Sequence, residues 1–172
     1  TRELATQINE ELIDFRGDLR IFSVCCVGGM GISNQIYGLR RDHNIVIGTP
    51  GRLKDLVERK RLHLNGFNTL VLDEADRMLD MGFIHDMRKI LENTPKDRET
   101  LFFSATMSTE IQRLVHDFLK NPVTISVKKK DVTDSIVQDV VKYGHHNKFD
   151  VLTELLKSGP FKRVLIFGAM KH

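Results

Sequence analysis

The sequence predicts an open α/β fold, in which a parallel β-sheet carries helices on both faces. Short apolar runs suited to buried strands alternate along the chain with segments whose apolar residues follow helical spacing. Two of these runs, residues 69–72 and 101–103, lead directly into the polar clusters 73–76 (Asp-Glu-Ala-Asp) and 104–106 (Ser-Ala-Thr). Strand ends are where an open parallel sheet holds its chemistry, so both clusters are candidates for a functional site.

Helices and strands are expected in alternation through the first 127 residues. The start signals are clearest where Pro50 follows Thr49, and where Ser108 precedes an apolar stripe at Ile111, Leu114, Val115 and Phe118. In chain order we expect a helix with Leu4, Ile8, Leu12 and Phe15 on one face, a strand over 21–27, a helix ending near Arg40, a strand over 44–48, a helix from Thr49 to about Arg59, a strand over 69–72, a helix over 84–91, a strand over 99–103, the helix that Ser108 caps, and a strand over 122–127.

A charged run, Lys-Lys-Lys-Asp at residues 128–131, interrupts this pattern. We interpret residues 128–134 as a linker between a first domain at 1–127 and the start of a second at 135–172. The run also fits a solvated loop with no binding role. Beyond it the pattern predicts a strand over 136–143, a helix with Phe149, Leu152, Leu155 and Leu156 on one side, and a strand over 163–167.

The composition is that of a soluble globular protein, and we expect no association with a membrane. Of the 172 residues, 41% are hydrophobic and 28% charged, and no apolar run approaches the roughly 18 residues of a spanning helix. A net charge of +3 is compatible with a polyanionic partner but does not by itself indicate one. Adjacent Cys25 and Cys26 cannot form an ordinary disulfide with each other, and free thiols favour a reducing, cytoplasmic location.

Asp73 and Glu74 are the strongest chemical candidates. A buried strand that delivers two adjacent carboxylates to a sheet edge is suited to holding Mg²⁺ and activating a water molecule. Taken alone, such a pair is also common in solvated turns and at helix N-termini. His145 and His146 are adjacent as well, but no further His or Cys stands at ligand spacing, which favours surface residues over a metal site.

Four motifs occur in series: residues 1–5 (Thr-Arg-Glu-Leu-Ala), 49–52 (Thr-Pro-Gly-Arg), 73–76 and 104–106. Together they make the chain resemble the DEAD-box RNA helicase family, which is built from two RecA-like domains of the P-loop NTPase type. Residues 164–167 (Val-Leu-Ile-Phe) are similar to the first motif of the second domain. No glycine is followed by lysine, so the family's phosphate-binding loop is absent and the fold is expected to be truncated at both ends.

The resemblance implies roles for the two polar clusters. Asp73 would hold Mg²⁺ through water, and Glu74 would act as the general base for ATP hydrolysis. Asp76, Ser104 and Thr106 would couple the state of the bound ATP to the separation of RNA strands. In isolation, Ser-Ala-Thr is more often an ordinary turn and helix cap.

The remaining motifs imply contacts to an RNA backbone. The helix beginning at Pro50 offers free N–H groups and a positive dipole end, to which Arg52 adds a charge-assisted contact. A Thr-Pro pair is also an ordinary helix start, and a glycine pair can simply form a turn. The residues implied in nucleic-acid binding are Arg2, Gly28, Gly29, Thr49, Gly51 and Arg52. Contacts to phosphate and sugar imply little sequence preference.

The function that the resemblance implies is ATP-dependent RNA unwinding, with ATP and Mg²⁺ as cofactors and RNA as partner. Without the phosphate-binding loop, residues 1–172 alone are expected to be inactive. Two alternatives remain open at this stage. One is a non-catalytic nucleic-acid-binding module, and the other is a different nucleotide-driven motor with a similar acidic strand.

Overall fold

The computed structural model describes residues 1–127, 137 and 139–168. The chain divides into two compact units, Thr1–Thr124 and Ile125–His172. The predicted linker at 128–134 lies outside the described residues, so the domain boundaries drawn there stay a prediction. Across the described parts of the chain, every helix is too short or too polar to span a lipid bilayer.

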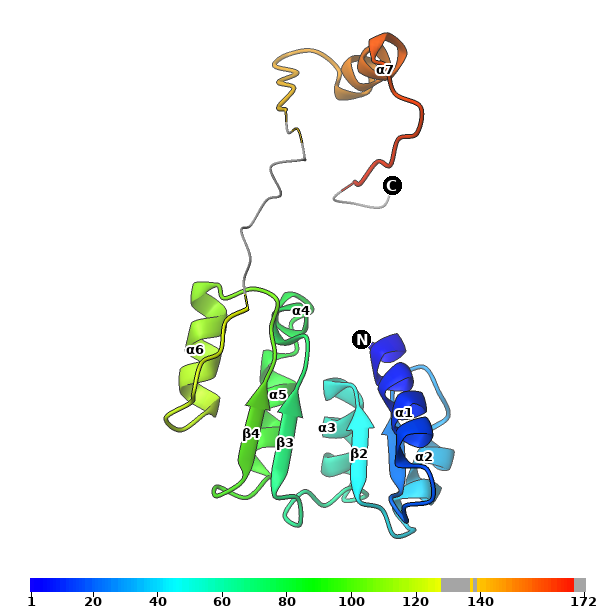
Figure 1. The fold of residues 1–172 in the computed structure, drawn as a ribbon, viewed down its shortest axis with the longest axis vertical. Coiled ribbons are helices and arrows are strands. Elements are labelled where there is room, and N and C mark those ends of the chain that lie inside the picture. The colour runs from blue at the N-terminus through cyan, green and yellow to red at the C-terminus, as the bar shows by residue number, and fades with distance from the viewer. Residues whose placement is uncertain (128–136, 138, 169–172) are drawn as a thin grey trace. The chain divides into compact units, whose positions relative to one another are not determined.

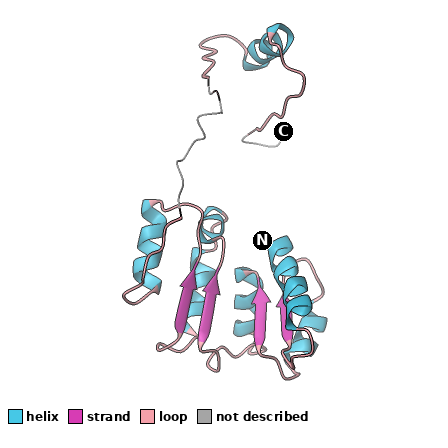
Figure 2. Cartoon of the chain, viewed as in Figure 1, coloured by secondary structure: helices cyan, strands magenta, loops and turns pink. Residues whose placement is uncertain are grey.

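The first unit alternates helices and strands, as predicted (Figure 2). Figure 1 shows α1 (Arg2–Arg16) in front of the strands and α3 (Pro50–Glu58) and α5 (Ile84–Glu92) behind them. Helices on both faces of parallel strands confirm the predicted α/β class. The other elements of this unit are β1 (Ser23–Cys26), α2 (Ile32–Leu39), β2 (Ile45–Gly48), β3 (Thr69–Leu72), α4 (Ala75–Asp80), β4 (Glu99–Phe102) and α6 (Thr109–Phe118).

The four strands form two parallel pairs. β1 pairs with β2 with Cys26 opposite Gly48, and β3 pairs with β4 with Leu72 opposite Phe102. The two pairs are separate two-stranded sheets, and α3 packs against α5 behind them. All four strands point the same way in Figure 1. Their carboxyl ends therefore lie at one edge of the unit, where both polar clusters were predicted.

Each strand pair has its own apolar core. Near β1 and β2 the buried residues are Cys26, Leu39, Leu56 and Leu62. Near β3 and β4 they are Leu72, Met87, Leu91, Ile111, Leu114 and Phe118. Full burial of a large apolar side chain favours folding by about 1.5–3 kcal/mol, so each half is stabilised mainly by its own helices.

The two cysteines lie on opposite faces of β1. Cys26 is fully buried in the first core, and desolvation, with a smaller effect of Cys25, raises the pKa of its thiol to about 12. The Cys25 Sγ lies 3.7 Å from the carbonyl oxygen of Ala5 in α1. Both are free thiols, and Cys26 acts as a small apolar side chain.

Helix starts follow the predicted signals with one difference. The Ser108 hydroxyl accepts a hydrogen bond from the Ile111 N–H at 3.3 Å, which confirms that cap. Thr49 occupies the N-cap position of α3 and Pro50 its first turn, but the Thr49 side chain makes no capping hydrogen bond. The fixed φ of proline, rather than a hydroxyl, therefore defines this helix start.

Three predicted strands are wrong. Residues 122–127 and 163–167, and the described part of 136–143, have no regular structure, while 136 and 138 lie outside the described residues. Val123, Ile125 and Val127 are 84–89% exposed. An apolar run becomes a strand only when a neighbouring strand accepts its hydrogen bonds and covers its side chains. Among the described residues none does so for these segments.

The predicted helices need two further corrections. The sequence-based interpretation missed α4, which begins directly after the paired acids. Phe15, assigned to the apolar face of the first helix, is 91% exposed, while Ala5 is the buried residue of that helix. In the second unit the predicted helix is confirmed as α7 (Lys148–Ser158), where the Asn147 side chain accepts a hydrogen bond from the Phe149 N–H at 2.8 Å.

Candidate functional site

The acidic cluster forms a tight turn between β3 and α4. Glu74 has a left-handed backbone with φ of 50°, and its N–H donates to the Asp73 carboxylate at 2.8 Å. Beyond the ends of both strands, the Phe103 N–H donates to the Leu72 carbonyl at 2.8 Å and the Ala75 N–H to the Phe103 carbonyl at 3.1 Å. These two bonds hold the acidic turn against the segment that leads into Ser104.

The two clusters meet through Asp76 and Thr106. The Asp76 Oδ2 accepts hydrogen bonds from the Thr106 N–H at 2.9 Å and the Thr106 hydroxyl at 3.0 Å. The Ser104 hydroxyl donates to the Thr106 carbonyl at 2.8 Å, which shapes the same turn. Burial alone would raise the pKa of Asp76, but hydrogen bonds from Thr106 and the Arg77 amide outweigh it and hold the pKa below its ordinary value.

Glu74 carries a carboxylate with unused hydrogen-bonding capacity. Its Oε2 is buried and has no hydrogen-bond partner among the described residues. The Arg77 guanidinium lies 3.8 Å from the Glu74 Oε1, which is distant for an ion pair. A buried acceptor without a donor is costly unless a ligand or water supplies one.

Asp73 is exposed, and the described residues contain no group of three or more His, Cys, Asp or Glu side chains placed to bind a metal. Mg²⁺ in nucleotide sites usually keeps several waters and takes only one or two carboxylates, with the phosphates supplying other ligands. One accessible carboxylate at Asp73 fits that mode of binding. It does not fit a metal held by protein ligands alone.

A second group of predicted residues surrounds the loop after β1. Gly29 has a φ of +80°, a conformation that favours glycine. The guanidinium of Arg2 occupies the space that a side chain at Gly29 would need, so α1 and the loop are in close contact. Arg52 reaches the same loop from α3, and both of its Nη atoms lie 3.2 Å from the Met30 carbonyl oxygen, to which they donate.

Gln35 belongs to this group although the sequence reading missed it. It is a buried polar residue of α2 that donates to the Val27 carbonyl at 3.0 Å and accepts from Arg52 Nη1 at 2.9 Å. The signal was present, because Gln35 lies among the apolar residues Ile32, Ile36 and Leu39 of the predicted second helix. A polar side chain on a buried face needs a partner, but the sequence does not name that partner.

Gly51 faces a neighbouring helix. A Cβ on Gly51 would lie 3.5 Å from an Asp86 carboxylate oxygen and 3.8 Å from the Phe83 ring, which are ordinary contact distances, so α3 and α5 lie close together at this point. The Thr49 N–H donates to the Cys26 carbonyl at 3.0 Å, which extends the pairing of β1 and β2 to the first turn of α3. The backbone at Thr49, where contacts to RNA are predicted, is therefore held in place by the end of β1.

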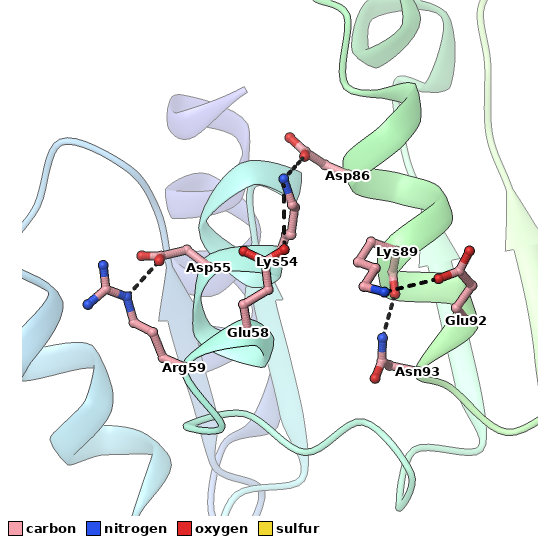
Figure 3. Close-up of polar contacts among 8 residues, drawn as sticks. All are labelled: Lys54, Asp55, Glu58, Arg59, Asp86, Lys89, Glu92 and Asn93. Atoms are coloured by element: carbon pink, nitrogen blue, oxygen red, sulfur yellow. Dashed lines mark hydrogen bonds and ion pairs between the residues drawn. The ribbon is translucent and has the colours of Figure 1, made fainter.

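The two halves of the unit are connected behind the strands. The Lys54 ammonium of α3 lies 3.1 Å from the Asp86 carboxylate of α5 and 4.0 Å from Glu58 (Figure 3). The hydrogen bond and charge of Asp86 raise the pKa of Lys54. The other pairs drawn there, Arg59 with Asp55 and Lys89 with Glu92, each stay within one helix.

Comparison with known proteins agrees with this geometry. The family model described as DEAD/DEAH box helicase matches residues 1–114. The chain belongs to the DEAD/DEAH box helicase family. At 43% identity over its whole length it is similar to the DEAD-box ATP-dependent RNA helicase CshA of Bacillus subtilis, and at 43% to the ATP-dependent RNA helicase CshA of Listeria monocytogenes. It covers 35% and 33% of those relatives, so this DEAD/DEAH box chain spans about a third of their length.

Solved structures of DEAD-box proteins share the fold. A crystal structure of a DEAD box protein from Methanococcus jannaschii matches with a TM-score of 0.67 at 43% identity, over 70% of this chain and 33% of that one. A hypothetical ATP-dependent RNA helicase from Sulfolobus tokodaii matches with a TM-score of 0.66 at 39% identity, over 70% and 36%. The RecA-like fold that the sequence predicted is thereby confirmed.

Proposed function

We propose that this chain is part of an ATP-dependent RNA helicase, in which residues 73–76 serve ATP hydrolysis and couple it to changes in bound RNA. The observation that supports this most directly is the double hydrogen bond from Thr106 to Asp76, which joins the acidic turn to the Ser-Ala-Thr turn. Family membership and the names of the relatives support the same reaction.

In this proposal Glu74 accepts a proton from the water that attacks the terminal phosphate of ATP. The proposal is supported by the Glu74 Oε2, which has no hydrogen-bond partner among the described residues. Asp73 would hold Mg²⁺ through water molecules, and the ion would neutralise charge on the phosphates. The turn that positions both carboxylates is fixed by backbone hydrogen bonds, so little reorganisation is needed when substrate binds.

RNA would bind along the same edge of the unit, at the carboxyl ends of β1 and β2. Arg2, Gly28, Gly29, Thr49, Gly51 and Arg52 would supply contacts to phosphate and sugar. Two features support this: the glycine loop exposes backbone near two guanidinium groups, and α3 presents its N-terminus next to it. We further propose a cytoplasmic location, which suits the free thiols.

Residues 1–172 alone are proposed not to hydrolyse ATP, because they contain no Gly-Lys phosphate-binding loop. The test compares this chain with the full-length protein in assays of ATP turnover and duplex separation, with and without RNA. We expect RNA-stimulated turnover and strand separation only from the full-length protein. A full-length protein that binds RNA without hydrolysing ATP would instead support the alternative of a non-catalytic nucleic-acid-binding module.

A further inference from the structure

Gln35, which lies outside the four sequence motifs, connects the loop after β1 to Arg52 of α3. The Gln35 side-chain amide donates a hydrogen bond to the carbonyl of Val27, the residue immediately before Gly28 and Gly29. The Gln35 side-chain oxygen accepts a hydrogen bond from Arg52. Arg52 in turn donates to the carbonyl of Met30, the residue immediately after the two glycines. The loop that contains Gly28 and Gly29 is thus held at both ends by one amide and one guanidinium. Glycine is the least restricted residue, so this loop depends on such contacts for a single conformation.

The contacts of Arg52 leave part of its guanidinium free. An arginine has five N–H donors, and three are directed here at the Met30 carbonyl and at Gln35. The remaining donors, on Nε and Nη2, are available to a phosphate. Which way they face is fixed by the three bonds already made, and one of those bonds depends on Gln35.

We propose that Gln35 is a positioning residue for RNA binding, which holds the loop at 28–31 and the Arg52 guanidinium in the arrangement that meets the RNA backbone. This inference rests on the proposed RNA function. Gln35 itself is 7% exposed and buried beneath the loop, so it acts through Arg52 and the Val27 carbonyl and does not touch RNA.

The test uses the full-length protein with Gln35→Leu, which removes both hydrogen bonds at similar size. Gln112→Leu makes the same chemical change at an exposed position of α6 and serves as the control. The first readout is hydrogen–deuterium exchange of the loop amides 28–31 without RNA. We expect faster exchange at these amides in Gln35→Leu alone. Unchanged exchange in both variants would show that the Gln35 side chain does not hold the loop in place.

The second readout is affinity for a single-stranded RNA oligonucleotide. We expect about tenfold weaker binding for Gln35→Leu, the effect of losing a hydrogen bond to a charged group, with an unchanged ATP concentration for half-maximal turnover. Faster loop exchange with wild-type RNA affinity would overturn the positioning role. If the wild-type protein binds no RNA, the proposed function fails. The hydrogen–deuterium exchange of the loop amides still decides, independently, whether Gln35 holds the loop.

A double-mutant comparison tests the route through Arg52. If Gln35 acts through this guanidinium, adding Gln35→Leu to Arg52→Ala weakens RNA binding little beyond Arg52→Ala alone. Losses that multiply would show that the two residues act independently and would overturn the proposed route.

Discussion

The half of the first unit built on β1 and β2 and the half built on β3 and β4 share an architecture but present opposite chemistry. In both, a parallel strand pair ends at the same edge and a helix begins within two or three residues. The first half brings Arg2, Arg52 and Gln35 around a glycine loop. The second brings carboxylates and hydroxyls together. One scaffold therefore carries a group of basic side chains and a group of carboxylates and hydroxyls at the same edge.

The largest expected effect tests the chemistry of the β3–β4 half. Glu74→Gln keeps the shape of the side chain but removes the base, so ATP turnover should fall by roughly 10²–10⁴ while RNA affinity stays near wild type. Glu11→Gln, at an exposed position of α1, is the matched control. Steady-state ATP hydrolysis by the full-length proteins measures the effect, and wild-type turnover in Glu74→Gln would remove this residue from the mechanism.

Asp76→Asn tests the connection within the same half. It weakens two hydrogen bonds to a charged acceptor, and we expect a loss of about 10- to 100-fold in the rate of duplex separation. RNA affinity should change much less. If strand separation and ATP turnover both stay at wild-type level, the contact between Asp76 and Thr106 has no coupling role.

The same variant makes a prediction about pH. Because the pKa of Asp76 is lowered in the folded state, its charge favours folding above the unfolded value of about 3.9, and this stabilisation is lost as the pH falls through the lower folded pKa. The difference in unfolding free energy between wild type and Asp76→Asn should therefore shrink as the pH is lowered from 5 to about 3. Denaturant unfolding at several pH values measures it, and a constant difference would contradict the prediction.

Arg52→Ala tests the β1–β2 half and should act on RNA alone. We expect about tenfold weaker RNA binding and a shallower dependence of affinity on salt, because one phosphate contact is lost. ATP turnover at saturating RNA should remain close to wild type. Arg113→Ala, an exposed arginine of α6, is the control, and an unchanged salt slope in Arg52→Ala would limit Arg52 to a structural role.

The smallest effect concerns the contact between the halves. Lys54→Met removes the ion pair with Asp86 but keeps an unbranched side chain of similar length. Ion pairs at the protein surface contribute little to stability, so the unfolding free energy should fall only slightly. A double-mutant cycle with Asp86→Asn measures the coupling between the two side chains, and a large coupling energy would show that the pair does more than join two helices.

The sequence predicted local features well and tertiary partners poorly. The strand at residues 69–72 was placed correctly because apolar residues and the acids after them mark both its ends. The helix α4 was missed because Asp76, Arg77 and Asp80 give its six residues no apolar stripe longer than one turn. Residues 163–167 have strand composition but no strand, since pairing is a property of neighbours and not of the segment itself.

The site shows the same limit. Motif order placed the acids and hydroxyls at one edge, where the structure has them, because strand ends of a parallel sheet must coincide. Their catalytic and binding roles stay predictions. Gln35 and the pair of Lys54 with Asp86 were not predictable, because each depends on which helices become neighbours. The sequence shows that Gln35 needs a partner, and only the fold shows that the partner is Arg52.

The backbone of Glu74 has a consequence for the evolution and engineering of this turn. A residue other than glycine at a φ of 50° costs roughly 1 kcal/mol, which Gly or Asn would largely avoid. Either replacement would ease folding and abolish the carboxylate. In a laboratory selection for thermal stability alone, position 74 should therefore change to Gly or Asn. If the glutamate persisted, it would indicate that ATP turnover was also under selection.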